Sequence, residues 1–261
     1  MKHTITLNQI DMNMTYSVKD NSPRGCHTAY GHTLKIGDKI VIDNYFHEII
    51  AETTETTETT ETGAKISISK GNAKLGAIPS VSLPACVTCN PGAPCFKQCY
   101  ARRIEYRYKE SRNAYARNLD ICQNNPVAYW AQVRGAAAMT RFFRYHVSGD
   151  IPSAEYFAEM VKTAEMLPGT NFLAFTKQCA TINEYMNGGG IIPANLKIIF
   201  SNWGAWKCDN PHNLPTCEII FKDTTPGETW KICGGNCTAC ACAGIGCWEL
   251  KNGETIAIYK H

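Results

Sequence analysis

The stretch FFRYHVSGDIPSAEYFAEMVKTAEMLPGTNFLAFTK, residues 142–177, determines the fold class that we predict for most of this chain. It begins with a short apolar run over residues 142–147 and ends with another over residues 172–176. Between them, residues 153–167 carry apolar side chains at helical spacing, and the Pro168-Gly169 pair ends that helix. A short strand, a helix and a second short strand in this order are typical of a βαβ unit with parallel strands.

The same alternation continues on both sides of this stretch. Further apolar runs predict strands over residues 65–69, 196–201 and 218–221. Further segments with helical spacing predict helices over residues 100–122, over 126–140 and up to 187. Strands that alternate with helices build a parallel sheet that the helices cover. The predicted fold class is therefore α/β, a partial (β/α) barrel with mostly parallel strands.

The first 63 residues have a different pattern. Residues 34–42 alternate apolar and polar side chains around Gly37-Asp38, which predicts a hairpin. Residues 52–62 repeat Thr-Thr-Glu and cannot bury apolar surface, so we interpret them as a solvated linker. We therefore expect a β-rich appendage over residues 1–63 and an α/β domain over residues 64–261, which also contains the cysteine segments described below as metal-binding.

Composition excludes several classes of protein. Hydrophobic residues make up 44% of the 261 residues, which is enough for a core. The net charge of +3 is too small to indicate a polyanionic partner by itself. No apolar run reaches eighteen residues, so we predict no membrane span. The N-terminus lacks the apolar segment of a secretory signal, so we expect a cytoplasmic protein.

Cysteine is the unusual residue, with 14 copies of which nine fall into two short segments. The first segment contains Cys86, Cys89, Cys95 and Cys99, and the second contains Cys233, Cys237, Cys240, Cys242 and Cys247. Thiols at short spacing in a chain that can build its own core favour metal ligation over disulfides. We predict that these nine residues hold one or two iron–sulfur clusters, most simply 4Fe-4S, with zinc as the alternative.

The other five cysteines are isolated in the sequence, and we interpret them as small buried hydrophobic residues: Cys26, Cys122, Cys179, Cys208 and Cys217.

Polar residues follow three successive predicted strands, at the sheet edge where α/β proteins bind ligands. The candidate cofactor-binding residues are His146, Ser148, Gly149, Asp150, Thr176, Lys177 and Ser201. Two of them have structural alternatives, because His146 is also compatible with a core histidine and Asp150 with a helix cap. No residue is singled out as catalytic.

The predicted helix over residues 100–122 interleaves arginines and lysines with tyrosines, a pattern that suits phosphate contact and base stacking. Nucleic acid is therefore a candidate partner. The alternative is a solvated helix face, since the chain as a whole is nearly neutral.

Several ordered motifs resemble the gene-product-eighty-eight-like family of bacteriophages and prophages. They are SKGNAKLG (69–76), SLPACVTCNPGAPCFKQCYA (82–101), FRYHVSGD (143–150), AFTK (174–177) and the second cysteine segment. The resemblance covers residues 65–250 and leaves out the N-terminal unit. It implies a cysteine-rich phage-type protein, which would be located in the host cytoplasm if a phage encodes it.

A more distant resemblance is to radical S-adenosylmethionine (SAM) enzymes. Ser148-Gly149-Asp150 stands where their motif for the SAM amino group follows a strand, and Cys95-x3-Cys99 is similar to the start of their cysteine motif. No third cysteine follows Cys99 at the required spacing, and Cys-x3-Cys-x2-Cys appears only in the second segment. The resemblance implies SAM as a cofactor, and this departure puts the open iron position for SAM in doubt.

Two functions follow as expectations. The first is an iron–sulfur enzyme with radical-SAM-like or redox chemistry on a nucleotide or nucleic acid. The second is a non-enzymatic module that binds nucleic acid or protein and contains structural zinc or iron–sulfur sites.

Overall fold

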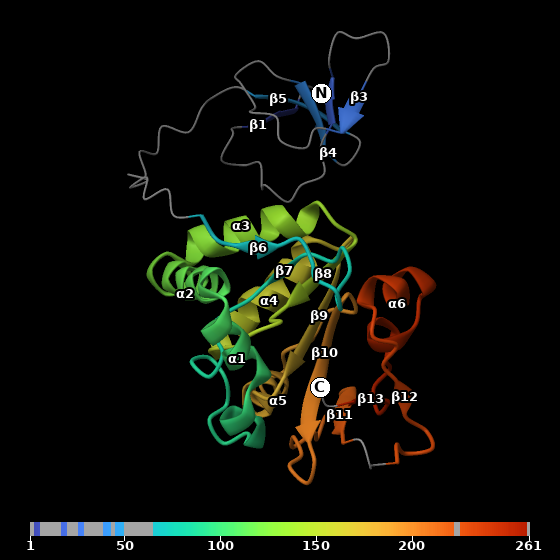
Figure 1. Ribbon diagram of the computed structural model, residues 1–261. Coiled ribbons are helices and arrows are strands. Elements are labelled where there is room, and N and C mark those ends of the chain that lie inside the picture. The colour runs from blue at the N-terminus through green and yellow to red at the C-terminus, as the bar shows by residue number, and fades with distance from the viewer. Residues whose placement is uncertain are drawn as a thin grey trace. The chain divides into compact units, whose positions relative to one another are not determined.

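The computed structural model (Figure 1) describes residues 65–221 and 225–259, together with the backbone of five short strands within residues 1–49. The chain divides into two compact units, residues 1–64 and residues 65–261. Among the described residues, no helix has the length and apolar character needed to cross a membrane.

The first unit contains a five-stranded sheet in the order β1-β5-β4-β2-β3. Its strands are β1 (His3–Ile5), β2 (Ser17–Lys19), β3 (Cys26–Thr28), β4 (Lys39–Ile42) and β5 (Tyr45–Ile49). β4 and β5 form an antiparallel hairpin with Ile42 opposite Tyr45. The predicted turn at Gly37-Asp38 and the Thr-Thr-Glu segment lie outside the described residues.

The second unit is built on an eight-stranded sheet in the order β12-β13-β11-β10-β9-β8-β7-β6. Its strands are β6 (Ile68–Ser69), β7 (Ser80–Val81), β8 (Phe142–Tyr145), β9 (Asn171–Thr176), β10 (Leu196–Trp203), β11 (Thr216–Ile220), β12 (Lys231–Ile232) and β13 (Thr255–Tyr259). Every neighbouring pair is parallel except β6 with β7. The prediction of an α/β fold with mostly parallel strands is confirmed.

Strands β7 to β11 follow one another in the sheet as they do along the chain. The helices between them are α1 (Tyr100–Arg107), α2 (Lys109–Asn124), α3 (Pro126–Ala138), α4 (Ala154–Met166) and α5 (Cys179–Asn187). This order resembles part of a (β/α) barrel, but the sheet is open, with β6 and β12 as its two edges. A closed barrel is therefore absent from the described strands, and the partial barrel stays a prediction.

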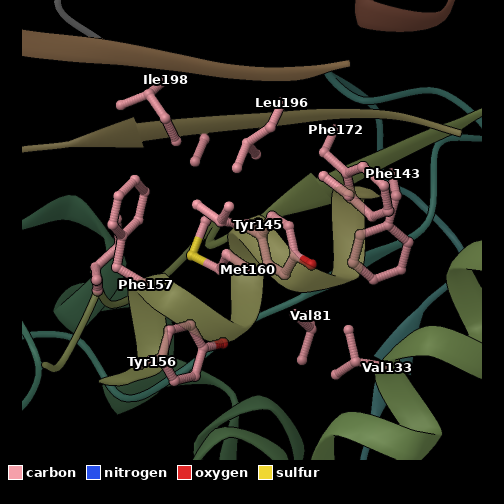
Figure 2. Close-up of a cluster of buried hydrophobic side chains, with 14 of the residues drawn as sticks. Val81, Val133, Phe143, Tyr145, Tyr156, Phe157, Met160, Phe172, Leu196 and Ile198 are labelled. Atoms are coloured by element: carbon pink, nitrogen blue, oxygen red, sulfur yellow. The ribbon is translucent and has the colours of Figure 1, made fainter. Parts of the chain in front are cut away.

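One face of the sheet, the helix face, packs against these helices. Alternation along the strands directs Phe143 and Tyr145 of β8 and Phe172 of β9 to this side, and all three are fully buried. Figure 2 shows them meeting Phe157 and Met160 of α4. This aromatic layer is the larger core of the unit.

The opposite face, the cysteine face, is covered by the C-terminal segment. Its core contains Leu173, Ile199 and Ile256 from the sheet and Trp248 from the cover. The cover consists of the short helix α6 (Cys237–Ala243) and the 3-10 turn η3 (Gly246–Glu249), and Figure 1 shows α6 on the side of the sheet away from α1. The Trp248 ring meets the Phe142 ring edge-on, with 5.0 Å between centroids.

The predicted single helix over residues 100–122 is wrong, because the chain breaks at Tyr108 into α1 and α2. Tyr108 has an extended backbone, with φ −117° and ψ 100°. A physical reason lies in two buried anchors. Glu105 of α1 accepts from the amide of Ala85 at 2.9 Å, whereas Asn118 of α2 accepts from the amide of Ser67 at 2.7 Å. Each helix is thus oriented by its own attachment.

Candidate functional site

The first cysteine segment is a loop over residues 82–99 that packs against the carboxyl ends of β8 and β9. The amide of Asp150 donates to the hydroxyl of Thr88 at 2.9 Å. The side-chain amide of Asn90 donates to the carbonyl of Lys177 at 3.2 Å. The loop, which includes the short 3-10 helix η2 (Pro94–Gln98), therefore lies at the edge where parallel sheets bind ligands.

The four thiols of this loop, at Cys86, Cys89, Cys95 and Cys99, are half-buried and interact with one another. Burial raises the pKa of Cys86 to about 11, and Cys99, to which it is hydrogen-bonded, and Cys95 add to the rise. Burial also raises the pKa of Cys89 to about 12; the charges of Asp150, Cys99 and Cys86 add to the rise, and a hydrogen bond to the backbone of Cys86 opposes it. Cys86 has a left-handed backbone with φ 64°, a strained conformation that is typical of functional sites when a residue is not glycine.

The second cysteine segment brings four of its five thiols to one hollow. The hollow is lined by Cys233, Gly234, Asn236, Cys237, Cys240, Cys247, Trp248 and Ile256. Cys242 is exposed and does not line it. Burial raises the pKa of Cys247 to about 12, and the charges of the other three thiols raise it further while Arg144 lowers it. The structure therefore separates four grouped thiols from one peripheral thiol.

The second segment is seated on the turn formed by residues 69–76. The amide of Cys237 donates to the carbonyl of Lys74 at 2.9 Å, and the hydroxyl of Thr238 donates to another carbonyl of this turn at 2.8 Å. Gly76 has φ 67°, and a Cβ atom there would lie 2.3 Å from Oγ1 of Thr238. The SKGNAKLG motif thus forms the support for α6, and glycine is required where the two segments touch.

Asp150 is buried, and its carboxylate is occupied by the protein itself. Oδ1 accepts from the hydroxyl of Thr176 at 2.7 Å and from the amide of Ile151 at 2.8 Å, and Oδ2 accepts from the amide of Lys177 at 2.9 Å. Burial raises its pKa above the usual value, against the lowering effect of these bonds. Ser153, and not Asp150, caps α4. Asp150 therefore ties the end of β8 to the end of β9.

His146 lies on the helix face, where its Nε2 atom is 3.0 Å from the hydroxyl of Tyr156. Its Nδ1 atom is buried without a hydrogen-bond partner among the described residues. Burial lowers the pKa of His146 to about 3, with a further lowering by Arg144, so the ring is neutral near pH 7. This placement matches the core-histidine alternative.

Ser148 and Gly149 hold the first cysteine loop to the sheet. The hydroxyl of Ser148 donates to the carboxylate of Glu105. Gly149 has φ 77°, and a Cβ atom there would lie only 2.6 Å from the carbonyl oxygen of Leu83. Both residues therefore have structural contacts that explain their positions.

The remaining pocket residues form a connected group at the carboxyl edge of the sheet. Thr176 binds Asp150, and Nζ of Lys177 donates to the hydroxyl of Ser201 at 2.8 Å. These contacts bring Asp150, Thr176, Lys177 and Ser201 together, whereas the ring of His146 contacts Tyr156 instead.

Two of the five isolated cysteines form a disulfide, which corrects the prediction that all five are buried free residues. Cys179 at the start of α5 and Cys208 after β10 are joined, with a Cα–Cα distance of 5.8 Å. The adjacent parallel strands β9 and β10 bring these distant residues to the same edge. Cys217 is a buried free thiol and Cys122 a half-buried one, while the side chain of Cys26 lies outside the described residues.

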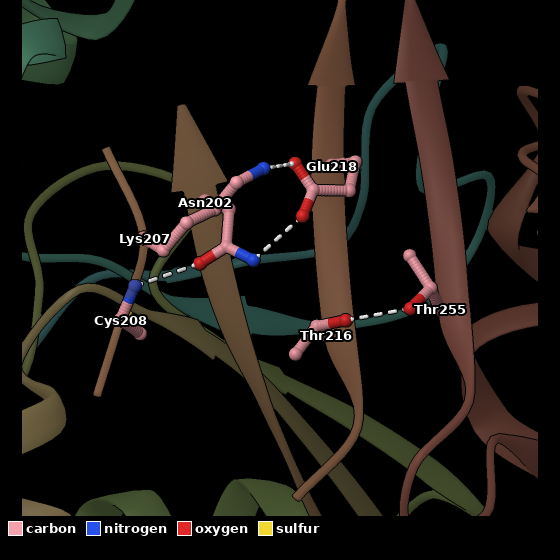
Figure 3. Close-up of polar contacts among 6 residues, drawn as sticks. All are labelled: Asn202, Lys207, Cys208, Thr216, Glu218 and Thr255. Atoms are coloured by element: carbon pink, nitrogen blue, oxygen red, sulfur yellow. Dashed lines mark hydrogen bonds and ion pairs between the residues drawn. The ribbon is translucent and has the colours of Figure 1, made fainter. Parts of the chain in front are cut away.

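A buried glutamate that the sequence analysis missed fixes the loop after β10 (Figure 3). Glu218 accepts from the side-chain amide of Asn202 at 2.7 Å and forms an ion pair with Lys207. Asn202 in turn accepts from the amide of Cys208 at 2.8 Å. The only signal for this network in the sequence is an acidic residue inside an otherwise apolar strand.

The two thiol groups do not have the geometry of a bound metal. Among the described residues, no three Cys, His, Asp or Glu side chains are close enough together to hold a metal ion. Their chemistry does fit one, because soft thiolate donors in fours are the usual ligands of iron–sulfur clusters and structural zinc.

Comparison with known proteins gives a family and no further relative. No curated protein and no solved structure matches the chain, so the resemblance to radical SAM enzymes has no support from these comparisons. The profile of the family described as gene product 88 matches residues 51–251, which include both cysteine segments and all the candidate pocket residues. The chain therefore belongs to the gene product 88 family.

Proposed function

We propose that this protein binds an iron–sulfur cluster through Cys233, Cys237, Cys240 and Cys247. The observation that supports the proposal is the hollow that these four thiols line, from which the fifth thiol of the segment, Cys242, is excluded. Four thiolates satisfy a 4Fe-4S cluster, which supplies one-electron redox chemistry when it is bound.

The first segment is the candidate for a second cluster, through Cys86, Cys89, Cys95 and Cys99. The amide of Arg102 donates to the sulfur of Cys99 at 3.5 Å. Hydrogen bonds to ligand sulfurs are one of the means by which proteins tune iron–sulfur clusters. Zinc remains the alternative occupant of either group, since four thiolates also suit a closed zinc site.

Redox chemistry is a better match to this arrangement than radical-SAM-like chemistry. Four thiols in each group leave no iron position open for SAM, and Asp150 already accepts three hydrogen bonds from the protein. We therefore propose an iron–sulfur redox protein of the cytoplasm, with a nucleotide or nucleic acid as the expected substrate.

A non-enzymatic role in nucleic-acid binding is the second candidate, and the surface of α1 favours it. Tyr106 is 87% exposed, and Tyr100 and Tyr108 are also exposed. Arg103 and Arg107 are exposed on the same short helix. Aromatic rings interleaved with arginines suit stacking on bases and contact with phosphates.

Metal analysis of the anaerobically purified protein tests the first proposal. We expect iron and sulfide near four per chain for one cluster, or near eight for two, with a visible absorption band and an EPR signal after reduction. Adding SAM should leave that signal unchanged. Zinc without sulfide would contradict the iron–sulfur assignment, and a signal perturbed by SAM would contradict the closed site.

Single cysteine variants provide the matched control. Cys240→Ser should lose the iron of the second segment, and Cys95→Ser that of the first, while Cys242→Ser should retain both. Equal loss from Cys240→Ser and Cys242→Ser would contradict the grouping of the four thiols.

Binding of single-stranded oligonucleotides tests the second candidate. Affinity should fall as salt increases and should fall again in the Arg103→Ala/Arg107→Ala double variant. Affinity that is insensitive to salt and to these changes would exclude this surface as a nucleic-acid site.

A further inference from the structure

Two cations on the cysteine face, Arg144 and Lys177, have no carboxylate partner among the described residues. The ion pairs in that part of the chain involve other cations, namely Arg134, Lys162, Lys207 and Lys231. Positive charges that are partly buried in a protein are normally paired with anions. Arg144 and Lys177 are therefore candidates to bind an anion, although the charge of Lys177 also acts on the carboxylate of Asp150 and lowers its pKa.

Arg144 is half-buried in the middle of β8. Its guanidinium lies over the ring of Phe175, 4.5 Å from the centroid. Its Nε atom is buried and has no hydrogen-bond partner in the described structure. A guanidinium presents its donors in a planar fork that matches a carboxylate or a phosphate.

Lys177 follows β9 on the same face of the sheet as Phe175, because side chains two residues apart along a strand point to the same side. Its Nζ atom donates to the hydroxyl of Ser201 at 2.8 Å. A hydroxyl fixes the position of the ammonium without neutralising its charge.

Both cations lie next to the cysteine segments. Phe142, which lies two residues before Arg144 and points to the same side of β8, meets the ring of Trp248 in the second segment at 5.0 Å. The carbonyl of Lys177 accepts from the side-chain amide of Asn90 in the first cysteine loop at 3.2 Å. Arg144 is therefore close to the second segment and Lys177 close to the first.

We propose that Arg144 and Lys177 bind a carboxylate or phosphate group of a small molecule on the cysteine face of the sheet, between the two cysteine segments. The site lies towards the carboxyl ends of parallel strands, where α/β proteins bind ligands. Phe175 supports the guanidinium, and Ser201 orients the ammonium. The bound anion then lies beside both thiol groups, as a substrate of an iron–sulfur redox centre must.

The proposal deepens the proposed function, but its central measurement does not depend on a cluster. The negative charge of a cluster at Cys237 and Cys247 is a competing reason for Arg144 to lie nearby. That alternative concerns Arg144 and the second segment, whereas Lys177 is close to the first. An experiment that measures anion binding and iron content in the same samples distinguishes an anion site from a role of Arg144 in holding the cluster.

Inorganic phosphate and succinate are suitable probes, measured by isothermal titration calorimetry on the full chain at fixed ionic strength. We expect at least one probe to bind with a dissociation constant in the millimolar range, and the tighter of the two identifies the anionic group. Arg144→Gln and Lys177→Gln should each weaken that binding at least about tenfold, as expected for a lost hydrogen bond between charged groups. Lys162→Gln, on the exposed side of α4, should bind like the unchanged protein.

Iron per chain and the midpoint of thermal unfolding are measured in each variant. Retained iron together with weakened anion binding supports the site. The proposal is overturned if neither probe binds above the level of chloride, or if Lys177→Gln binds normally. It is also overturned if Arg144→Gln loses iron but keeps its affinity for the probe. If Arg144→Gln does not fold, Arg144→Lys replaces it and should weaken binding while preserving the charge.

Discussion

The two faces of the central sheet are stabilised in different ways. The helix face buries an aromatic layer that includes Tyr145, Phe157 and Phe172 beneath α2 to α5. The cysteine face is covered by α6, a helix of seven residues, and by the 3-10 turn η3. Its core mixes a few apolar side chains with the partly buried thiols of the second segment.

This difference indicates where the fold depends on a ligand. A seven-residue helix is too short to be stable by itself, so α6 needs its contacts with the sheet and with residues 69–76. Thiols grouped around a hollow add stability only when a metal or cluster joins them. We therefore expect the helix face to stabilise the fold without a ligand. The cysteine face should keep its structure only when its ligand is bound.

The largest expected effect comes from truncating the core of the helix face. Phe157 is fully buried and meets the ring of Tyr185 edge-on at 5.1 Å. Phe157→Ala should lower the free energy of unfolding by about 3–5 kcal/mol, because it removes buried surface and leaves a cavity. Urea denaturation followed by circular dichroism measures the loss, with Lys162→Ala on the same helix as the control.

A loss below about 1 kcal/mol for Phe157→Ala would contradict the difference between the two faces, because the helix face would then contribute no more than an ordinary surface. Trp248→Ala tests the cysteine face in the same way. That variant should cost less stability in metal-free protein than Phe157→Ala, since fewer apolar side chains surround it.

Removal of the metal is the second test and should affect only one face. A ligand present at one hundred times its dissociation constant stabilises its site by about 2.7 kcal/mol. Amide hydrogen exchange in residues 233–250 should therefore become about a hundredfold faster after chelation and reduction, while exchange in β8, β9 and β10 should stay unchanged. Mass spectrometry of peptides from the two regions measures both rates. Equal acceleration in both would show that the faces unfold as one unit.

The sheet could be predicted from the sequence because its signals are local. Apolar runs such as residues 172–176 and the helical spacing of residues 153–167 need no knowledge of distant contacts. The sequence pattern does not predict β7 and β12 because each has only two residues, and it does not predict β13 because no helix follows that strand among the described residues.

The site was harder to predict, because its contacts join residues far apart in sequence. The grouping of Cys233 with Cys247, the pairing of Cys179 with Cys208 and the burial of Asp150 all depend on which strands are neighbours. The sequence shows two cysteine segments, but it does not divide the five thiols of the second segment into the four that line the hollow and the one that does not. The sequence does not mark Arg144 as a binding residue, because a single arginine in an apolar strand has no distinctive pattern.

The third test concerns the attachment of the first cysteine loop to the sheet. Gly149→Ala should destabilise the protein by about 1–3 kcal/mol, because its φ of 77° is strained for alanine and the Cβ would press on the backbone of Leu83. Gly169→Ala is the matched control, since no atom lies within 4 Å of its Cβ position and its backbone is not left-handed. Thermal unfolding of both variants measures the difference. If they behave alike, the close approach of the loop to Gly149 is not required.

The smallest expected effect is a dependence on pH that belongs to the helix face alone. Burial lowers the pKa of His146 to about 3, so the folded protein keeps this ring neutral while the unfolded chain protonates it near pH 6.5. The stability that the neutral ring contributes is complete above pH 6.5 and is lost as the pH falls towards 3. Between pH 7 and pH 6 the loss should be roughly 0.7 kcal/mol, a range in which ordinary carboxylates do not titrate. His146→Asn tolerates the left-handed backbone at φ 56° and should remove this slope. Urea denaturation at the two pH values, in metal-free protein, measures it. An unchanged slope in His146→Asn would mean that the pH dependence arises elsewhere, and that the helix face is not sealed from water at His146.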